Sequence, residues 1–119
     1  MKDFHKLIDE SINEVKAAGI TPGNIVNWRI NTRAKSRWGL CKKLNDGTGF
    51  EIQIAHILLV SDDVSEKACK TTIIHEILHT CEGCKGHTGL WKQYAAIMNE
   101  KYGYNIKRTT SGAEKGLMN

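Results

Sequence analysis

Three histidines and one glutamate have the spacing of a catalytic metal site. His75-Glu76-Ile77-Leu78-His79 has the form H-E-x-x-H, and His87 follows eight residues after the second histidine. Residues four apart lie on the same face of an α-helix, so His75 and His79 can reach one ion with Zn–N distances of about 2.0–2.1 Å. Glu76 lies beside that face, where it can take a proton from a metal-bound water and later return it to a leaving amine. This arrangement is typical of a metallopeptidase.

Chance does not readily produce this motif. Independent placement of the chain's histidines and glutamates gives roughly 0.014 occurrences of H-E-x-x-H in a chain of this length. The alternative interpretation is a helix whose two histidines are only surface or core residues. The third histidine favours the metal site, and so do the apolar residues around the motif, which are Ile73, Ile74, Ile77 and Leu78.

The residues that flank the motif predict how the chain presents its three histidines. Asp63, with a glutamate three residues later, resembles a capping box, so we expect the motif helix at about residues 64–80. After the helix, Gly83 and Gly86 supply the conformational freedom for the chain to double back. His87 can therefore reach the same ion as a third ligand.

Apolar periodicity and turn residues divide the rest of the chain into helices and strands. The patterns predict further helices at about residues 3–18 and 90–101, strands at residues 25–30, 37–41 and 50–54, and a short closing strand at 104–108. Asn45-Asp46-Gly47 makes the second and third strands a hairpin. We expect an α+β fold in which helices pack on a small, mostly antiparallel sheet.

Length and composition indicate one globular domain. With 119 residues, 40% of them hydrophobic, and a net charge of +4, the chain can bury about two-thirds of its unfolded surface. We expect the domain to cover residues 1–108, followed by a polar tail, 109–119, that nothing packs down. No long apolar stretch and no secretory signal are recognisable, which predicts a cytoplasmic protein without a membrane span. Thiols are then expected rather than disulfides at Cys41, Cys69, Cys81 and Cys84.

Two further patterns each have a functional and a plain interpretation. Arg29, Arg33, Lys35 and Arg37 form an acid-free basic stretch with tryptophans interleaved, which suits contact with a nucleic acid. Such alternation is also common on the solvent face of a strand, and we favour that interpretation. The pair Cys81-x-x-Cys84 could bind a second metal, form a redox-sensitive disulfide or only pack, and packing is favoured.

Three segments occur in the order found in SprT-like zinc metallopeptidases. They are Asn31–Cys41, which ends Arg37-Trp38-Gly39-Leu40-Cys41; the strand Phe50–Ala55; and His75–His79 with Gly86-His87-Thr88-Gly89-Leu90-Trp91. These resemble the family's R-x-x-x-x-W-G-x-C strand, its strand before the metal helix, its H-E-x-x-H and its G-H-x-x-x-W third-ligand element. The resemblance spans roughly residues 25–108.

The resemblance implies a zincin-like minimal metallopeptidase domain with zinc-dependent endopeptidase activity. It makes His75, His79 and His87 the ligands of one Zn²⁺ per chain and Glu76 the catalytic acid/base. Protein or peptide substrates are expected, with DNA-associated proteins among the candidates. In zincins the strand beside the active-site helix pairs with extended substrate, which here indicates five residues: Phe50, Ile52, Gln53, Ile54 and Ala55.

The chain departs from SprT and Spartan proteins in two ways. The segment between the second and third histidines, Thr80–Gly86, is shorter, as in smaller bacterial relatives that act as minimal metallopeptidases, and no paired C-x-x-C knuckles follow Tyr104. A second hypothesis is a nucleic-acid-associated or partner-binding module whose zinc is only structural. The sequence does not rank the candidates for stabilising a tetrahedral oxyanion, which are Tyr94, Tyr102, Tyr104 and Arg108.

Overall fold

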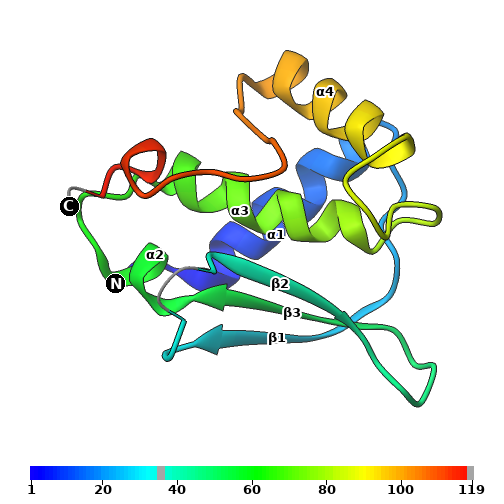
Figure 1. Ribbon diagram of the computed structural model, residues 1–119, viewed down its shortest axis with the longest axis horizontal. Coiled ribbons are helices and arrows are strands. Elements are labelled where there is room, and N and C mark those ends of the chain that lie inside the picture. The colour runs from blue at the N-terminus through cyan, green and yellow to red at the C-terminus, as the bar shows by residue number, and fades with distance from the viewer. Residues whose placement is uncertain (35–36, 118–119) are drawn as a thin grey trace.

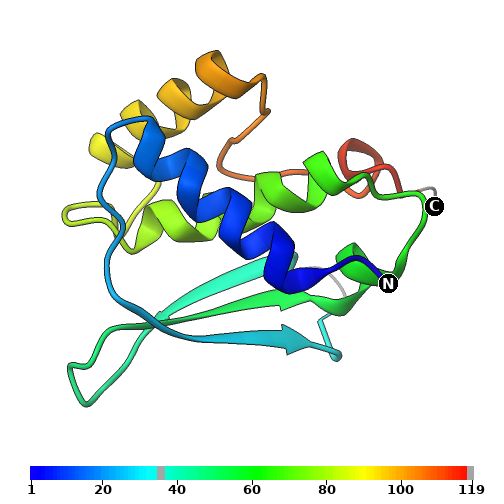
Figure 2. The ribbon, with the colours of Figure 1, turned by 180° about the vertical axis from the view of Figure 1, so that it is seen from behind.

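The computed structural model describes residues 1–34 and 37–117, and it has an α+β architecture (Figure 1). The elements in chain order are α1 (Phe4–Ala17), β1 (Ile25–Asn31), β2 (Gly39–Lys43), β3 (Phe50–Ala55), α2 (His56–Val60), α3 (Glu66–His79), α4 (Leu90–Tyr102) and the 3₁₀ turn η1 (Ala113–Lys115). Helices α1 and α3 lie over one face of the sheet, and α4 lies beyond α3. Helix α1 passes behind α3 in Figure 1 and in front of it in Figure 2. The α+β class is confirmed.

The sheet is mixed, so the expectation of a mostly antiparallel sheet is wrong. Its strand order is β1-β3-β2, with β1 parallel to β3 and β2 antiparallel to β3. The β2–β3 hairpin is as predicted. Burial explains why β3 is central, since Ile52 and Ile54 are completely buried, whereas β1 alternates exposed and half-buried positions. A strand buried along its length is stabilised by neighbours on both sides.

Helix α1 is fixed at its start by a cap and along its length by the core. The Asp3 side chain accepts a hydrogen bond from the Lys6 backbone N–H (3.1 Å), and Leu7 and Val15 are completely buried. On its other side, Glu14 accepts hydrogen bonds from Lys70 of α3 and from the Tyr104 hydroxyl. This small polar cluster ties α1 to α3 and to the segment after α4.

Helix α3 carries the motif and is the most enclosed element of the fold. Eight of its residues are buried: Cys69, Thr71, Thr72, Ile73, Ile74, Glu76, Ile77 and Leu78. It begins later than the capping-box pattern predicts, because the N-cap is Ser65, whose hydroxyl accepts from the Ala68 N–H (3.0 Å). Asp63 therefore lies outside the helix. The two residues of difference leave the relative positions of the histidines unchanged.

Three other segments differ from expectation. Residues His56–Val60 form α2, which the sequence patterns did not indicate. Residues 104–108 form no strand, because the Asn99 side chain occupies both backbone groups of Ile106 (2.7 and 2.9 Å). The expectation of a loose tail is wrong for residues 109–117. The Thr110 carbonyl accepts a hydrogen bond from Trp38 Nε1 (3.0 Å). Lys115 is only 3% exposed, and its Nζ donates a hydrogen bond to the Ala68 carbonyl (3.0 Å).

Across residues 1–34 and 37–117, no helix combines the length and the apolar character needed to cross a membrane.

Candidate metal centre and substrate cleft

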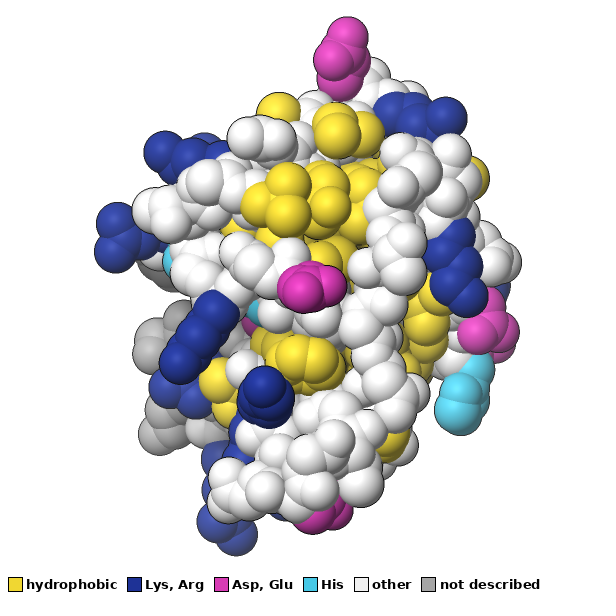
Figure 3. Space-filling view, turned by 90° about the vertical axis from the view of Figure 1, so that its right-hand side faces the viewer, with side chains coloured by type: hydrophobic (Ala, Val, Ile, Leu, Met, Phe, Trp, Pro, Cys, Tyr) yellow, Lys and Arg dark blue, Asp and Glu magenta, His cyan; other side chains and the backbone are white. Residues whose placement is uncertain are grey.

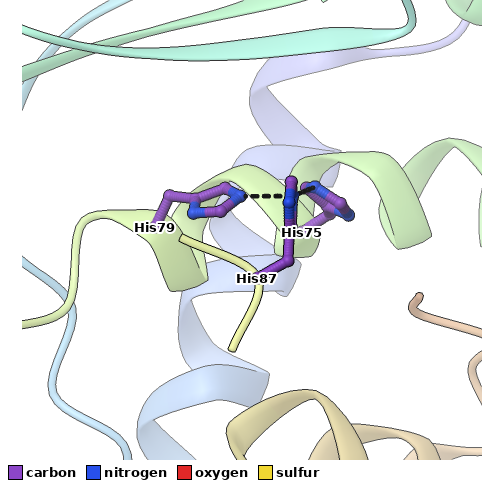
Figure 4. A group of neighbouring side chains, drawn as sticks. All are labelled: His75, His79 and His87. Atoms are coloured by element: carbon purple, nitrogen blue, oxygen red, sulfur yellow. Dashed lines mark hydrogen bonds between the residues drawn. The ribbon is translucent and has the colours of Figure 1, made fainter. Parts of the chain in front are cut away.

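The three predicted ligand histidines converge on one point (Figure 4). His75 and His79 project from the same face of α3, and His87 approaches from the loop that follows it. The Nε2 atom of His87 lies 3.0 Å from that of His75 and 2.9 Å from that of His79. Gly83 adopts a φ of 80° in the loop, as predicted, whereas Gly86 has no positive φ.

Mutual hydrogen bonding does not account for this geometry. A neutral imidazole nitrogen either donates one hydrogen bond or accepts one. His87 Nε2 can therefore form a hydrogen bond with His75 Nε2 or with His79 Nε2, but not with both. Three nitrogen lone pairs directed at a shared cation remove the conflict. Ligands at 2.0–2.1 Å in tetrahedral directions would have their nitrogens about 3.3 Å apart, close to the spacing observed. The donor set therefore fits a metal ion.

A backbone carbonyl group orients one of the rings. His79 Nδ1 lies 2.9 Å from the Cys84 carbonyl, so this nitrogen donates and Nε2 keeps its lone pair. Burial, followed by the charges of the other two histidines, lowers the pKa of His75 to about 3. The pKa values of His79 and His87 are also lowered, chiefly by burial, which keeps the rings neutral and able to ligate.

Trp91 forms the floor of the cluster. Its ring stacks on His79 (centroids 5.4 Å apart, planes at 17°) and meets His75 and His87 edge-on at 4.8 and 4.7 Å. Only 2% of Trp91 is exposed, so it packs in the core and fixes the imidazoles from beneath.

Glu76 lies beside the histidines in a confined space. Its Oε2 atom is 3.9 Å from His75 Nε2, and 6% of the residue is exposed. Burial raises the pKa of Glu76 to about 8, although the charges of Arg37 and Lys115 act in the opposite direction. A methyl group on Gly39 of β2 would come within 2.8 Å of that oxygen. The glutamate thus fits only because β2 has no side chain at this point.

An open cleft of about 1270 Å³ runs past this cluster. One border is β2 together with Arg37 and Trp38; the other is formed by the loop between α3 and α4 and by residues 107–110. His75, Glu76, His79 and His87 all face into it. Figure 3 looks from the side of the β2–β3 turn, and most Lys and Arg side chains of this view gather on its left.

The expected substrate-binding strand needs correction. β3 pairs with β1 on one side and with β2 on the other, so its backbone has no free edge for an added strand. Ile52, Ile54 and Ala55 are buried, and the Gln53 side chain hydrogen-bonds Glu51. Of the five residues, only Phe50 lines the cleft. Sequence order could not reveal that β3 inserts between its two neighbours.

β2 has the position expected of a substrate strand. Within the described residues it pairs only with β3, and Gly39, Leu40, Cys41 and Lys43 line the cleft. The signal in the sequence was Gly39, a residue that weakens a strand interior and often marks a close approach.

The basic stretch is divided by the fold. Arg29 is exposed and pairs in register with Gln53, on the strand face opposite to the buried Ile52 and Ile54. Arg33 is exposed in the turn after β1, and Arg37 lines the cleft. Lys35 lies outside the described residues. Trp28 packs inward with its ring edge-on to Phe4, so it is no exposed stacking platform.

The structure also separates the oxyanion candidates. The hydroxyl groups of Tyr102 and Tyr104 both donate to Glu14, on the side of α1. Tyr94 and Arg108 line the cleft. Of the four candidates, only Tyr94 and Arg108 therefore border the cleft that contains the histidines and Glu76.

The four cysteines are free thiols, as expected. Burial is the first cause that raises the pKa of each, to about 12 for Cys41 and about 11 for Cys69 and Cys81. Such thiols are poor nucleophiles at neutral pH. In the described part of the chain, the only group of three or more possible metal ligands is the histidine triad.

Comparison with known proteins agrees with this site. The sequence model of the SprT-like family matches residues 2–110, which includes every residue of the histidine and glutamate cluster. Searches of curated proteins and of solved structures found no match. Since the match covers most of the chain, this protein belongs to the SprT-like family.

Proposed function

We propose that this protein is a zinc-dependent endopeptidase. The observation that carries the proposal is the convergence of three neutral imidazoles beside a buried carboxylate, at the side of an open cleft. Three histidine ligands that leave a position open are the donor set of catalytic zinc sites. A fully protein-ligated structural zinc would need a fourth ligand.

Zn²⁺ bound to His75, His79 and His87 would supply a Lewis acid for the scissile carbonyl and a bound water of lowered pKa. Glu76 would accept a proton from the attacking water and return it to the leaving amine. Its dry surroundings favour this role, since burial raises its pKa from the ordinary range to about 8, close to neutral pH, even though the charges of Arg37 and Lys115 act in the opposite direction.

Substrate backbone is expected to pair with the free edge of β2. An extended peptide added there would run along the cleft, with its side chains alternating between the sheet and the opposite border. Tyr94 and Arg108 are the side chains available to stabilise the oxyanion that forms when water adds to the carbonyl. Recognition through backbone hydrogen bonds tolerates many sequences.

The decisive test is Glu76→Gln, assayed for zinc content and for cleavage of casein. We expect one zinc per chain, as in the parent, and a loss of turnover on the order of 10²- to 10⁴-fold. Glu82→Gln is the matched control, because Glu82 is an exposed glutamate of the same cleft. Equal cleavage by the Glu76→Gln protein would contradict the general-base role of Glu76. A parent protein that holds zinc but cleaves no casein would contradict the peptidase proposal and favour a binding module with a structural zinc. Action on DNA-associated proteins and a cytoplasmic location stay predictions.

A further inference from the structure

The positive charge of this protein is concentrated in the cleft. Six cationic residues line it, namely Arg37, Lys43, Lys85, Lys107, Arg108 and Lys115, against two acids, Glu76 and Glu82. The whole chain has 17 Lys and Arg and 13 Asp and Glu. Removing the cleft residues leaves 11 of each, so the rest of the sequence is neutral and the cleft accounts for the net charge of +4. A concave site of one sign focuses its field on what enters.

Four of these six cations are free to meet a ligand. Lys107 pairs with Glu114 (2.5 Å), and Lys115 is buried with its Nζ on the Ala68 carbonyl. The other four, Arg37, Lys43, Lys85 and Arg108, are exposed and form no ion pair with a carboxylate of residues 1–34 or 37–117. Within the described residues, no carboxylate therefore neutralises these four charges in a salt bridge.

The free cations surround the reacting centre rather than cluster at one end. The charge of Arg37 lowers the pKa of Glu76, and the charge of Arg108 lowers the pKa of His87, so these two cations lie near the glutamate and the histidines. Lys43 lies at the far end of β2, six residues after Arg37. The distance along the extended chain between these two residues is at most about 20 Å. A strand bound along β2 would therefore pass positive charge on both sides of its scissile bond.

A peptide fits this cleft better than a nucleic acid does. The free edge of β2 offers alternating backbone N–H and C=O groups, which another extended backbone can match in full, whereas phosphate oxygens can use only the N–H donors. Outside the cleft, the sequence has equal numbers of cations and acids, so the rest of the chain adds no net positive charge to attract a phosphate backbone. Trp28 packs inward against Phe4, so its indole does not stand free for stacking on bases.

We propose that the cleft selects acidic substrates, that is, extended peptide segments with Asp or Glu side chains on either side of the scissile bond, which Arg37, Arg108 and Lys43 bind. This inference rests on the proposed peptidase function, because it assumes that the ligand of the cleft is a peptide substrate. The preference arises from charge pairing at the borders of the cleft, in addition to the backbone pairing with β2.

The test compares two fluorogenic decapeptides of identical sequence except that Asp in one replaces Asn in the other on both sides of the cleavage site. With the zinc-loaded full chain at low ionic strength, we expect kcat/KM to be on the order of 10-fold higher for the Asp peptide, and the ratio to shrink in 0.5 M salt. Arg37→Gln and Arg108→Gln should each reduce the ratio several-fold, and Lys43→Gln should reduce it less. The ratio separates selectivity from any general loss of activity.

Two variants serve as matched controls. Arg29→Gln and Lys42→Gln remove exposed cations that pair in register with Gln53 and Glu51, away from the cleft, and they should leave the ratio unchanged. Equal kcat/KM for both peptides in the parent protein would overturn the acidic preference while leaving the peptidase proposal intact. A ratio unaffected by the Arg37 and Arg108 substitutions would also overturn it.

Binding to the zinc-loaded Glu76→Gln protein provides an arm that does not need turnover. We expect the Asp peptide to bind more tightly than the Asn peptide in fluorescence anisotropy. If neither peptide is cleaved by the parent, the peptidase proposal fails, but this binding difference and its loss in Arg37→Gln would still support acidic selection. A single-stranded oligonucleotide that displaces the Asp peptide at lower concentration than unlabelled peptide does would instead identify a nucleic-acid site.

Discussion

Replacing Gly39 by alanine tests whether the strand backbone positions the glutamate. A Cβ at residue 39 would lie 2.8 Å from Glu76 Oε2, 2.9 Å from Glu76 Cγ and 2.9 Å from Thr72 Cγ2. Ordinary van der Waals contacts begin at 3.4 Å, so the carboxylate or the strand must move by about 0.5 Å. Gly39 has no positive φ, which means that the effect comes from contact and not from backbone strain.

The expected cost follows from that displacement. A misplacement of about 1 Å in an active site can reduce turnover about 100-fold, so about 0.5 Å should reduce kcat on the order of 10-fold, or about 1.4 kcal/mol. Overpacking should also lower the free energy of unfolding by about 1–3 kcal/mol. Zinc content should stay at the parent level, because the three atoms nearest to the added methyl group belong to Glu76 and Thr72 and not to a histidine.

The assay is steady-state peptide cleavage together with zinc content and urea unfolding. Gly112→Ala is the control, because a Cβ there would meet its nearest neighbours at 3.8 and 4.0 Å, and that glycine also has no positive φ. A Gly39→Ala protein that retains zinc and cleaves within twofold of the parent would refute the contact argument. So would an equal loss of activity in the Gly112→Ala protein.

Three further outcomes are expected. In the metal-free protein, burial raises the pKa of Glu76 from 4.5 to about 8, so the free energy of unfolding falls as the pH rises between these two values. Compared with the parent, the Glu76→Gln protein should be more stable by a few kcal/mol at pH 9 and about equally stable at pH 4. Thermal unfolding at the two pH values measures this difference. His87→Ala should hold less than one zinc per chain, and a chelator should then lower its melting temperature less than that of the parent, as elemental analysis and calorimetry would show. Glu14→Gln should cost about 1–3 kcal/mol in urea unfolding, because the amide removes the negative charge that pairs with Lys70, whose side chain is 12% exposed, and leaves one acceptor oxygen for the two donors, Lys70 and the Tyr104 hydroxyl; an unchanged midpoint would contradict this.

Local patterns predicted the parts of this protein whose structure depends on neighbours along the chain. The motif spacing, the bounds of α1 and α4 within about two residues, and the β2–β3 hairpin all follow from periodicity and turn residues. The convergence of His75, His79 and His87 followed from helix geometry plus a flexible return of the chain.

What the sequence could not provide was pairing between distant segments. The parallel pairing of β1 with β3 places residues 24 or 25 apart in register, and no turn signal encodes it. That single fact moves the free sheet edge from β3 to β2 and so changes which residues can meet a substrate. The packed tail is a similar case, because polar residues such as Lys115 become buried only where a distant carbonyl, here that of Ala68, accepts their hydrogen bond.

The three histidines belong to parts of the molecule with different local stability. His75 and His79 lie on α3, whose amides are expected to exchange with solvent only when the whole domain unfolds, whereas His87 lies on a loop flanked by exposed residues. Opening of that loop removes one ligand and leaves the other two in place. Metal exchange can therefore proceed through the loop at a rate unrelated to global unfolding, and a stable fold does not imply slow release of the ion.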